Sequence, residues 1–273
     1  PMAPAMRTPP TVPALVAALL LAAVPARAGT AREILDRVRT LDDTTRHWTD
    51  RSQKMTLVIT DTHGGERRRE LQVFTKRYPG DEDKALSFFL SPPEVKGTGF
   101  LQWSHKTTDD DQWLYLPEFK RTRRITAQLK DESFMGTDFS YRDLEILGEI
   151  QRWTEDEAPT RLTGEERVDG SACHVIEFHP KQDGMTYGRI VVWLDQDKLT
   201  LRQMDFYDRD EAKLKRLVLG KIADIGAIPT PAALDMETVK KGSRTHVDVA
   251  DVRYDAGLED DLFTQRYLER GAP

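Results

Sequence analysis

Short segments of alternating apolar and polar residues, separated by turn-forming residues, recur from about residue 53 to residue 254. The segment QKMTLVIT at 53–60, the turn HGG and the segment RELQVFTKR together have the pattern of a β-hairpin. Farther along, Asp169 and Gly170 provide a two-residue turn between two more such segments. The pattern predicts ten or eleven strands in a meander. Because strands and helices do not alternate, we predict a mainly β fold, with one antiparallel sheet and a few helices.

Three stretches interrupt the strand pattern with helical character. The segment TAREILDRVRTL places apolar residues three and four positions apart, which predicts a helix over 31–42. Thr30 is the expected N-cap of this helix, and Glu33 would complete a capping box. A second helix is expected to begin near Phe139, and a short third one lies in EDDLFTQRYLER near the end of the chain.

The first 28 residues have the pattern of a cleaved secretory signal peptide. Arg7 precedes an apolar stretch over 12–24, and ARA at 26–28 fits the small-residue cleavage site. The apolar stretch is shorter than the roughly 20 residues that a membrane-spanning helix needs. We therefore expect a signal peptide at 1–28 and a single exported domain over 29–273, with no membrane span in the mature chain.

Charge and motif content narrow the function classes. The formal net charge of −6 argues against a general nucleic-acid binder. Cys173 is the only cysteine, so no intramolecular disulfide can form. The six histidines have no compact metal-binding spacing, and the sequence contains neither a G-x-S-x-G nucleophile motif nor a phosphate-binding loop. We predict no catalytic residue, no metal and no cofactor.

The run FKRTRRI carries four closely spaced basic residues. On a strand, Arg121 and Arg123 would share one face, while Lys120 and Arg124 would share the other. Two interpretations stay open. The run is a solvated edge strand whose charges deter aggregation, or it is a surface on which acidic lipid headgroups or a partner protein dock.

The stretch SFMGTDFSYRDL at 133–144 combines aromatic residues with a glycine and two aspartates. Gly136 can supply a turn with positive φ, and Asp138 or Thr137 is expected to cap the helix that begins near Phe139. That helix would be apolar on two sides. It is either a structural plug between two apolar surfaces or a gate that moves over a cavity.

Three ordered segments, PPEVKGTGFLQW, DQWLYLPEFKRTRRI and ESFMGTDFSYRDLE, together with FTQRYLER near the end, resemble a divergent branch of the LolA-like outer-membrane lipoprotein-sorting proteins. The resemblance implies an incomplete, strongly curved antiparallel half-barrel with helices that form a lid or plug. It also implies a periplasmic location and a hydrophobic cavity that shields acyl chains from water. An inner-membrane RND/MMPL-type transporter or an outer-membrane acceptor is the partner that it implies.

Strand parity, combined with this resemblance, predicts which apolar side chains line the cavity and its lid. The candidates are Met55, Leu57, Ile59, Leu71, Val73, Trp103, Trp113, Tyr115, Phe134, Met135, Phe139 and Trp193.

We expect a periplasmic carrier or chaperone that binds the acyl chains of lipids or lipoproteins, and not an enzyme. One alternative is a lipid or lipoprotein sensor or adaptor that works with the transporter. Another is an enzyme that uses the cavity, for which a buried cluster of Asp138, Tyr141, Arg142, Asp143 and a histidine would argue.

Overall fold

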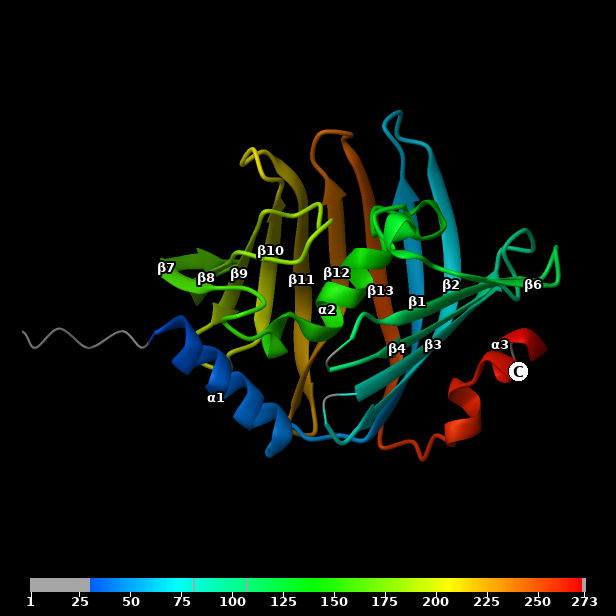
Figure 1. The fold of residues 1–273 in the computed structure, drawn as a ribbon, viewed down its shortest axis with the longest axis horizontal. Helices are drawn as coiled ribbons and strands as arrows, with labels where there is room; N and C mark the ends of the chain where they lie inside the picture. The colour runs from blue at the N-terminus through cyan, green and yellow to red at the C-terminus, as the bar shows by residue number, and fades with distance from the viewer. Residues whose placement is uncertain (1–29, 81, 107, 272–273) are drawn as a thin grey trace, which may run out of the picture.

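The computed structural model describes residues 30–80, 82–106 and 108–271, and the signal peptide predicted at 1–28 lies outside them. The described residues form thirteen strands, three α-helices and four short 3₁₀ helices (Figure 1). The helices are α1 (Ala31–Asp43), α2 (Tyr141–Glu149), α3 (Gln265–Arg270), η1 (Ala127–Leu129), η2 (Phe134–Gly136), η3 (Ile150–Arg152) and η4 (Asp260–Phe263). The strands are β1 (Asp50–Thr60), β2 (Glu66–Tyr78), β3 (Glu82–Ser91), β4 (Gly99–Ser104), β5 (Asp111–Leu116), β6 (Arg121–Arg124), β7 (Thr160–Val168), β8 (Ser171–Phe178), β9 (Arg189–Asp195), β10 (Leu201–Tyr207), β11 (Lys213–Ile225), β12 (Ile228–Thr238) and β13 (Ser243–Tyr254).

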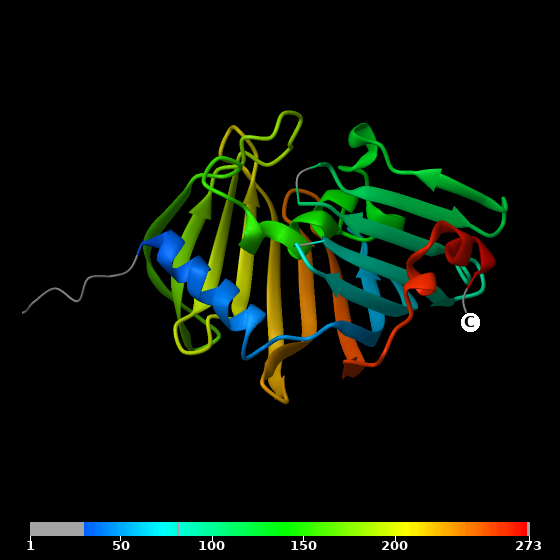
Figure 2. The same cartoon turned by 60° about the horizontal axis from the view of Figure 1, so that its bottom comes forward.

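All thirteen strands belong to one antiparallel sheet that is curved but not closed into a barrel (Figures 1 and 2). The spatial order is β6-β5-β4-β3-β2-β1-β13-β12-β11-β10-β9-β8-β7. The two halves of the chain therefore form two meanders, which meet where β1 pairs with β13. This confirms the predicted antiparallel, incomplete barrel. The predicted total of ten or eleven strands was too low.

The order of the strands explains why α2 lies over the inner face of the sheet. Strands β6 and β7 are neighbours in the sequence but form opposite edges of the sheet. The connection between them, residues 125–159, must therefore cross the whole sheet. It does so over the inner, concave face and carries α2 there, in front of β11, β12 and β13 (Figure 1). The stretch 133–144 is part of this crossing.

Several strands are apolar on both faces because both faces are covered. In β9, Ile190, Val192 and Leu194 belong to the main core on the inner side, whereas Val191 and Trp193 form a small cluster on the outer side. The alternation follows from the two-residue period of side chains along a strand. A half-barrel with two covered faces thus needs continuous apolar runs instead of simple alternation.

Helices α1 and α3 close different parts of the sheet. Thr30 caps α1, and Glu33 completes the predicted capping box. Ile34, Leu35 and Val38 of α1 join the main core. In contrast, α3 packs on the outer face, where Leu268 contributes to a second core cluster over β3, β4 and β5 (Figure 2). None of the helices in the described part of the chain is long and apolar enough to cross a bilayer.

Candidate ligand-binding site

A groove of about 420 Å³ lies between α2 and the inner face of the sheet. We call it the apolar groove, because most of its lining is aliphatic or aromatic. Strands β1, β2 and β13 contribute one wall, and β10, β11 and β12 continue it. Its volume falls within the range of about 300–1,000 Å³ that is usual for small-molecule sites.

Six of the twelve predicted lining residues lie along the apolar groove. They come from neighbouring strands β1 and β2 and from the crossing segment, and they are Met55, Leu57, Leu71, Val73, Phe134 and Phe139. In the strands they share one face because their numbers differ by two, and the pairing of Met55 with Leu71 places both strands in register. Phe134 lies edge-on against Phe100, with ring centres 5.2 Å apart.

Two further candidates lie close to these residues without lining the groove. Ile59 continues the inner face of β1 and is buried. Met135 packs against the main core, and its carbonyl oxygen accepts a hydrogen bond from the Arg69 guanidinium. Met135 and Gly136 both have positive φ, 52° and 74°, so the predicted turn at Gly136 is present.

The remaining four candidates lie on the outer face of the sheet, and their assignment to the groove is therefore corrected. Trp103, Trp113 and Tyr115 pack in the cluster beneath α3. Trp193 belongs to the outer cluster of β9, where its indole Nε1 donates to Glu166 at 3.0 Å. Both faces of these strands are apolar, so alternation alone could not identify the inner one.

The sequence prediction missed the contributions of α2 and of the second meander. In the groove, α2 and the strands of the second meander place aliphatic side chains near those of β1 and β2. The missed residues are Leu144, Leu147, Leu201, Leu217, Leu219, Leu234, Val247 and Val249. Alternation within each strand was visible in the sequence. The pairing of β1 with β13, which brings the two meanders to one groove, was not.

Asp138 anchors the crossing segment to the sheet instead of capping α2. The carboxylate of this buried residue accepts hydrogen bonds from Thr238 at 2.7 Å, from Thr245 at 2.8 Å and from Ser243. The N-cap of α2 is Ser140, whose hydroxyl accepts from the backbone N–H of Asp143. The predicted cap at Asp138 or Thr137 was wrong because α2 begins two residues later than expected.

Asp143 forms a second anchor at the start of α2. Its carboxylate is fully buried and accepts from the Tyr187 hydroxyl at 2.6 Å and from the Lys215 ammonium at 2.5 Å. Burial, followed by the nearby Asp143 charge, raises the pKa of Tyr187 well above its ordinary value. Because Asp138 and Asp143 each accept several hydrogen bonds from distant residues, residues 138–143 are fixed to the rest of the fold at two points.

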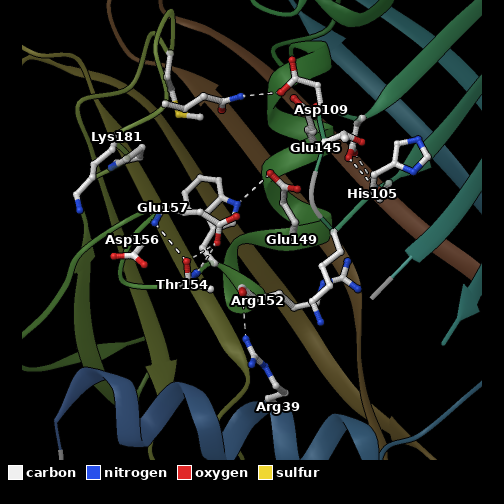
Figure 3. Close-up of a pocket in the computed structure, with 18 residues that line it drawn as sticks. Arg39, His105, Asp109, Glu145, Glu149, Arg152, Thr154, Asp156, Glu157 and Lys181 are labelled. Atoms are coloured by element: carbon white, nitrogen blue, oxygen red, sulfur yellow. Dashed lines mark hydrogen bonds between the residues drawn. The ribbon is translucent and has the colours of Figure 1, made fainter. Parts of the chain in front are cut away.

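A polar cavity of about 910 Å³ adjoins the C-terminal half of α2 (Figure 3). It adjoins the apolar groove, and Ser104 and Arg152 line both. Glu149 points into it and accepts from the Trp153 indole at 3.0 Å. Burial, followed by the nearby charges of Asp110 and Glu145, raises the pKa of Glu149 to about 8.

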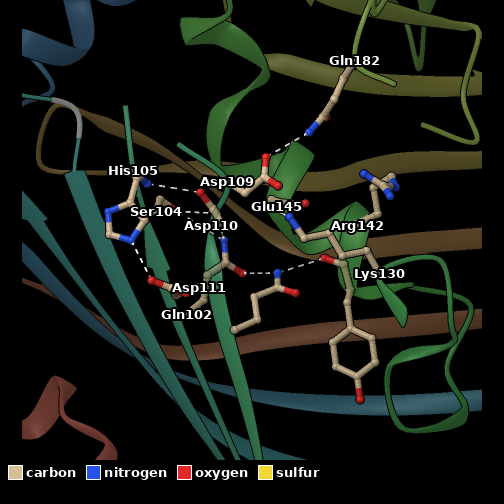
Figure 4. A network of polar contacts seen from close by, with 12 residues as sticks. Gln102, Ser104, His105, Asp109, Asp110, Asp111, Lys130, Arg142, Glu145 and Gln182 are labelled. Carbon is tan, nitrogen blue, oxygen red and sulfur yellow. Dashed lines mark hydrogen bonds and ion pairs between the residues drawn. The ribbon is translucent and has the colours of Figure 1, made fainter. Parts of the chain in front are cut away.

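A buried polar network lies at the edge of this cavity, and its residues Ser104, Asp110 and Glu145 line the cavity (Figure 4). Asp110 accepts from Gln102 and from Ser104, both at 2.9 Å. Lys130 and Glu145 form an ion pair at 2.5 Å, and both side chains are almost completely buried. Burial raises the pKa of Asp110 as well. The network satisfies these groups internally, as buried polar side chains require.

The basic run lies at one edge of the sheet. Lys120 has a φ of 47° and completes the turn between β5 and β6, and β6 is an edge strand with only β5 as its neighbour. Arg121, Arg123 and Arg124 are all exposed, and Arg124 pairs with Asp111. The geometry is that of the predicted solvated edge. Docking of headgroups or of a partner on the run stays a prediction.

The arrangement is suited to holding an apolar chain, and the polar groups of the helix-bearing crossing segment are engaged in internal contacts. Tyr141 packs on Phe100 and Phe134, and the carboxylates of Asp138 and Asp143 each accept several hydrogen bonds. In the part of the chain that the structure describes, no three His, Cys, Asp or Glu side chains converge as a metal-ligand set.

A family model described as an uncharacterized protein matches residues 81–270. The chain is 31% identical to a DUF1329 family protein of known structure from Desulfovibrio piger, with 87% of this chain and 97% of that chain covered and a TM-score of 0.79. No curated protein matches the sequence.

Two other solved structures extend the comparison. An outer membrane lipoprotein-sorting protein domain from Vibrio parahaemolyticus is 30% identical over 88% of this chain and 98% of that one, with a TM-score of 0.80. A LolA superfamily protein from Nitrosomonas europaea is 19% identical over 88% of this chain and 100% of that one, with a TM-score of 0.65, which shows the shared fold. As the three sequence segments predicted, the chain belongs to the LolA-like family of outer-membrane lipoprotein-sorting proteins.

Proposed function

We propose that the protein is a periplasmic carrier that binds the acyl chains of lipids or lipoproteins non-covalently in the apolar groove. The groove itself carries the proposal, because it is lined by aliphatic and aromatic side chains from both meanders and from α2. Membership in a lipoprotein-sorting family supports the same role and the same compartment. The transporter and the outer-membrane acceptor stay predictions.

The energetics of burial fit a carrier. Each CH₂ group that leaves water contributes about 0.8 kcal/mol, so an acyl segment of about ten carbons gains about 8 kcal/mol. Part of this gain is lost in ordering the chain and in restricting its motion. Binding in the micromolar range, about 8 kcal/mol, would hold a cargo during transfer and still allow its release.

A buried cluster of Asp138, Asp143 and neighbouring residues with a histidine would have argued for the enzyme alternative. Asp138 instead bonds to three hydroxyl groups, and Asp143 bonds to Tyr187 and Lys215. No histidine is among the hydrogen-bond partners of either aspartate in the described residues. These contacts favour the carrier over the enzyme.

The first test is to identify what the mature protein carries. After expression with export, native mass spectrometry and lipid extraction should find acyl lipid bound to the protein. A fluorescent acyl probe should bind and be displaced by the extracted lipid. Absence of bound lipid together with failure of the probe to bind would overturn the proposal.

A matched pair of variants on β13 locates the binding site. Val249 lines the apolar groove, whereas its neighbour Ala250 is exposed on the other face of the strand. The Val249→Asp variant should weaken probe binding at least tenfold, because a carboxylate in the groove would lose hydration when an acyl chain binds. The Ala250→Asp variant should bind as the wild type does. Equal affinity of both variants would place the probe elsewhere.

A further inference from the structure

Three arginines gather at one end of the apolar groove. Arg51 of β1 and Arg152 of η3 both line it. Arg51 is paired with Thr75 of β2, and Arg77 lies two residues farther along the same strand. Side chains two residues apart point to the same face, so Arg77 also projects to the inner side, beside Arg51. We call Arg51, Arg77 and Arg152 the arginine cluster.

Two of these guanidinium groups are held in place by one aromatic ring. The Cζ atom of Arg77 lies 3.9 Å from the ring centre of Trp48, and that of Arg51 lies 5.2 Å from it. Trp48 is 7% exposed, so its ring is held in place by the surrounding core. Stacking on a buried ring orients a guanidinium while leaving its N–H groups free to donate. In Arg51 the buried Nε atom has no hydrogen-bond partner.

The charges around the cluster do not balance. Arg152 forms an ion pair with Asp83 at 3.1 Å. In the described residues, neither Arg51 nor Arg77 has a carboxylate oxygen within the 4.0 Å of an ion pair. Burial raises the pKa of Asp42, the acidic residue of α1 that faces Arg77. The inner side of the groove thus holds more positive than negative charge at this end.

Burial makes this excess costly for the ligand-free protein. Burial lowers the pKa of Arg77, although Asp83 and Asp42 oppose the effect. Two guanidinium groups over one ring also repel each other. An anion placed between them would supply the missing acceptors and the missing charge.

We propose that the arginine cluster binds the anionic head, a phosphate or a carboxylate, of an amphiphile whose acyl chain lies in the apolar groove. This inference rests on the proposed carrier function and narrows its cargo. Arginine matches these two anions because its planar fork donates two parallel hydrogen bonds to them. A free lipid with a charged head fits this arrangement better than the acylated end of a lipoprotein, whose ester and amide groups are uncharged.

The test compares heads on a constant ten-carbon chain by isothermal titration below the micelle concentration. The probes are decyl phosphate, decanoate, monodecanoylglycerol and decyltrimethylammonium, with inorganic phosphate as a chain-free control. Both anionic probes should bind at least tenfold more tightly than the neutral one, because hydrogen bonds to charged groups contribute about 1.5–3 kcal/mol. The cationic probe should bind most weakly.

Variants assign the preference to the cluster. Arg51→Gln and Arg77→Gln should each reduce affinity for decyl phosphate about tenfold and should reduce affinity for monodecanoylglycerol much less. Retained binding of the neutral probe shows that the variants are folded. Arg51→Lys should recover only part of the loss, since it keeps the charge without the fork. Arg68→Gln serves as the control, because Arg68 is exposed on the opposite face of β2.

The outcomes separate this inference from the carrier function. Equal affinity for all heads, or anion preference that persists in both glutamine variants, would overturn the inference and leave the carrier intact. Failure of every ten-carbon probe to bind would overturn the carrier itself. Binding of inorganic phosphate as tight as that of decyl phosphate would overturn both, because the chain would then contribute nothing.

Discussion

At the scale of single residues, Glu149 shows how a partly closed cavity changes the chemistry of a carboxyl group. Its pKa rises from 4.5 to about 8 in the folded protein. Between these pH values the folded state therefore holds a proton that the unfolded state has released. The free energy of unfolding should fall as pH rises through this interval, by at most about 1.4 kcal/mol per pH unit from this group.

Urea unfolding at pH 5, 6, 7 and 8 would measure this effect. The wild type should lose stability relative to Glu149→Gln across the series, because the amide cannot ionise. Glu94→Gln removes an exposed carboxylate outside the cavity and should run parallel to the wild type. Parallel curves for the wild type and Glu149→Gln would contradict the raised pKa.

Asp138 gives the second prediction at this scale. Replacing it with alanine would leave the hydroxyls of Thr238, Ser243 and Thr245 without their common acceptor. We expect a loss of about 2–4 kcal/mol in the free energy of unfolding. Hydrogen exchange over 133–140 should become faster, whereas Asp138→Asn, which keeps one acceptor, should lose less. An unchanged unfolding midpoint for Asp138→Ala would contradict an anchoring role.

Asp138 marks the limit of what the sequence could predict. The turn at Gly136 and the capping box at Thr30 depend on residues within three positions, and both were predicted. The partners of Asp138 lie 100 or more positions away, so its anchoring role was hidden. The Ser140 cap was visible in principle, because Ser140 and Asp143 have capping-box spacing.

At the scale of elements, the outer face depends on one glycine. A Cβ atom on Gly99 of β4 would lie 2.6 Å from Leu268 Cδ1 and 2.8 Å from Phe88 Cε1. Leu268 and Phe88 are fully buried, so their side chains or α3 would have to shift. The absence of a side chain at this position therefore permits α3 to pack against the sheet.

We expect Gly99→Ala to lower the free energy of unfolding by about 1–3 kcal/mol through overpacking. The double variant Gly99→Ala/Leu268→Ala should lose less stability than the sum of the losses of the two single variants, because truncation of Leu268 makes room for the new methyl group. Gly220→Ala is the matched strand control, since its Cβ would meet only Ala233 at an ordinary 3.9 Å. Urea unfolding of the wild type, the three single variants and the double variant checks this, and a Gly99→Ala variant as stable as Gly220→Ala would contradict it.

Elements were easier to predict than the faces that they bury. The alternation in β4 and β5 located the strands, and both faces of these strands are apolar. Trp103 and Trp113 lie under α3, on the face of the sheet opposite to that of Phe100 and Leu114. Which face of β4 and β5 lies beneath α3 depends on the path of α3, and the local sequence pattern of the strands does not encode that path.

At the scale of the whole molecule, the topology places the apolar groove where the two meanders meet. Strands β1 and β2 come from the first meander, and β10 to β13 come from the second. The crossing segment covers the groove and is fixed by Asp138 to β12 and β13 and by Asp143 to Tyr187 and Lys215. The two anchors favour the plug over the gate for residues 138–143, while the C-terminal half of α2 has the polar cavity beside it.

Acyl binding should therefore stabilise the molecule as a unit. A ligand at 100 times its dissociation constant raises the free energy of unfolding by about 2.7 kcal/mol, which corresponds to roughly 5–10 °C in Tm for a chain of this size. Hydrogen exchange should slow in α2 and in the strands of both meanders that line the groove, and should stay unchanged in α3 on the outer face. The Val249→Asp variant should show neither effect with the same probe. Stabilisation confined to one meander would contradict a shared groove, because an acyl chain in it must contact both halves at once.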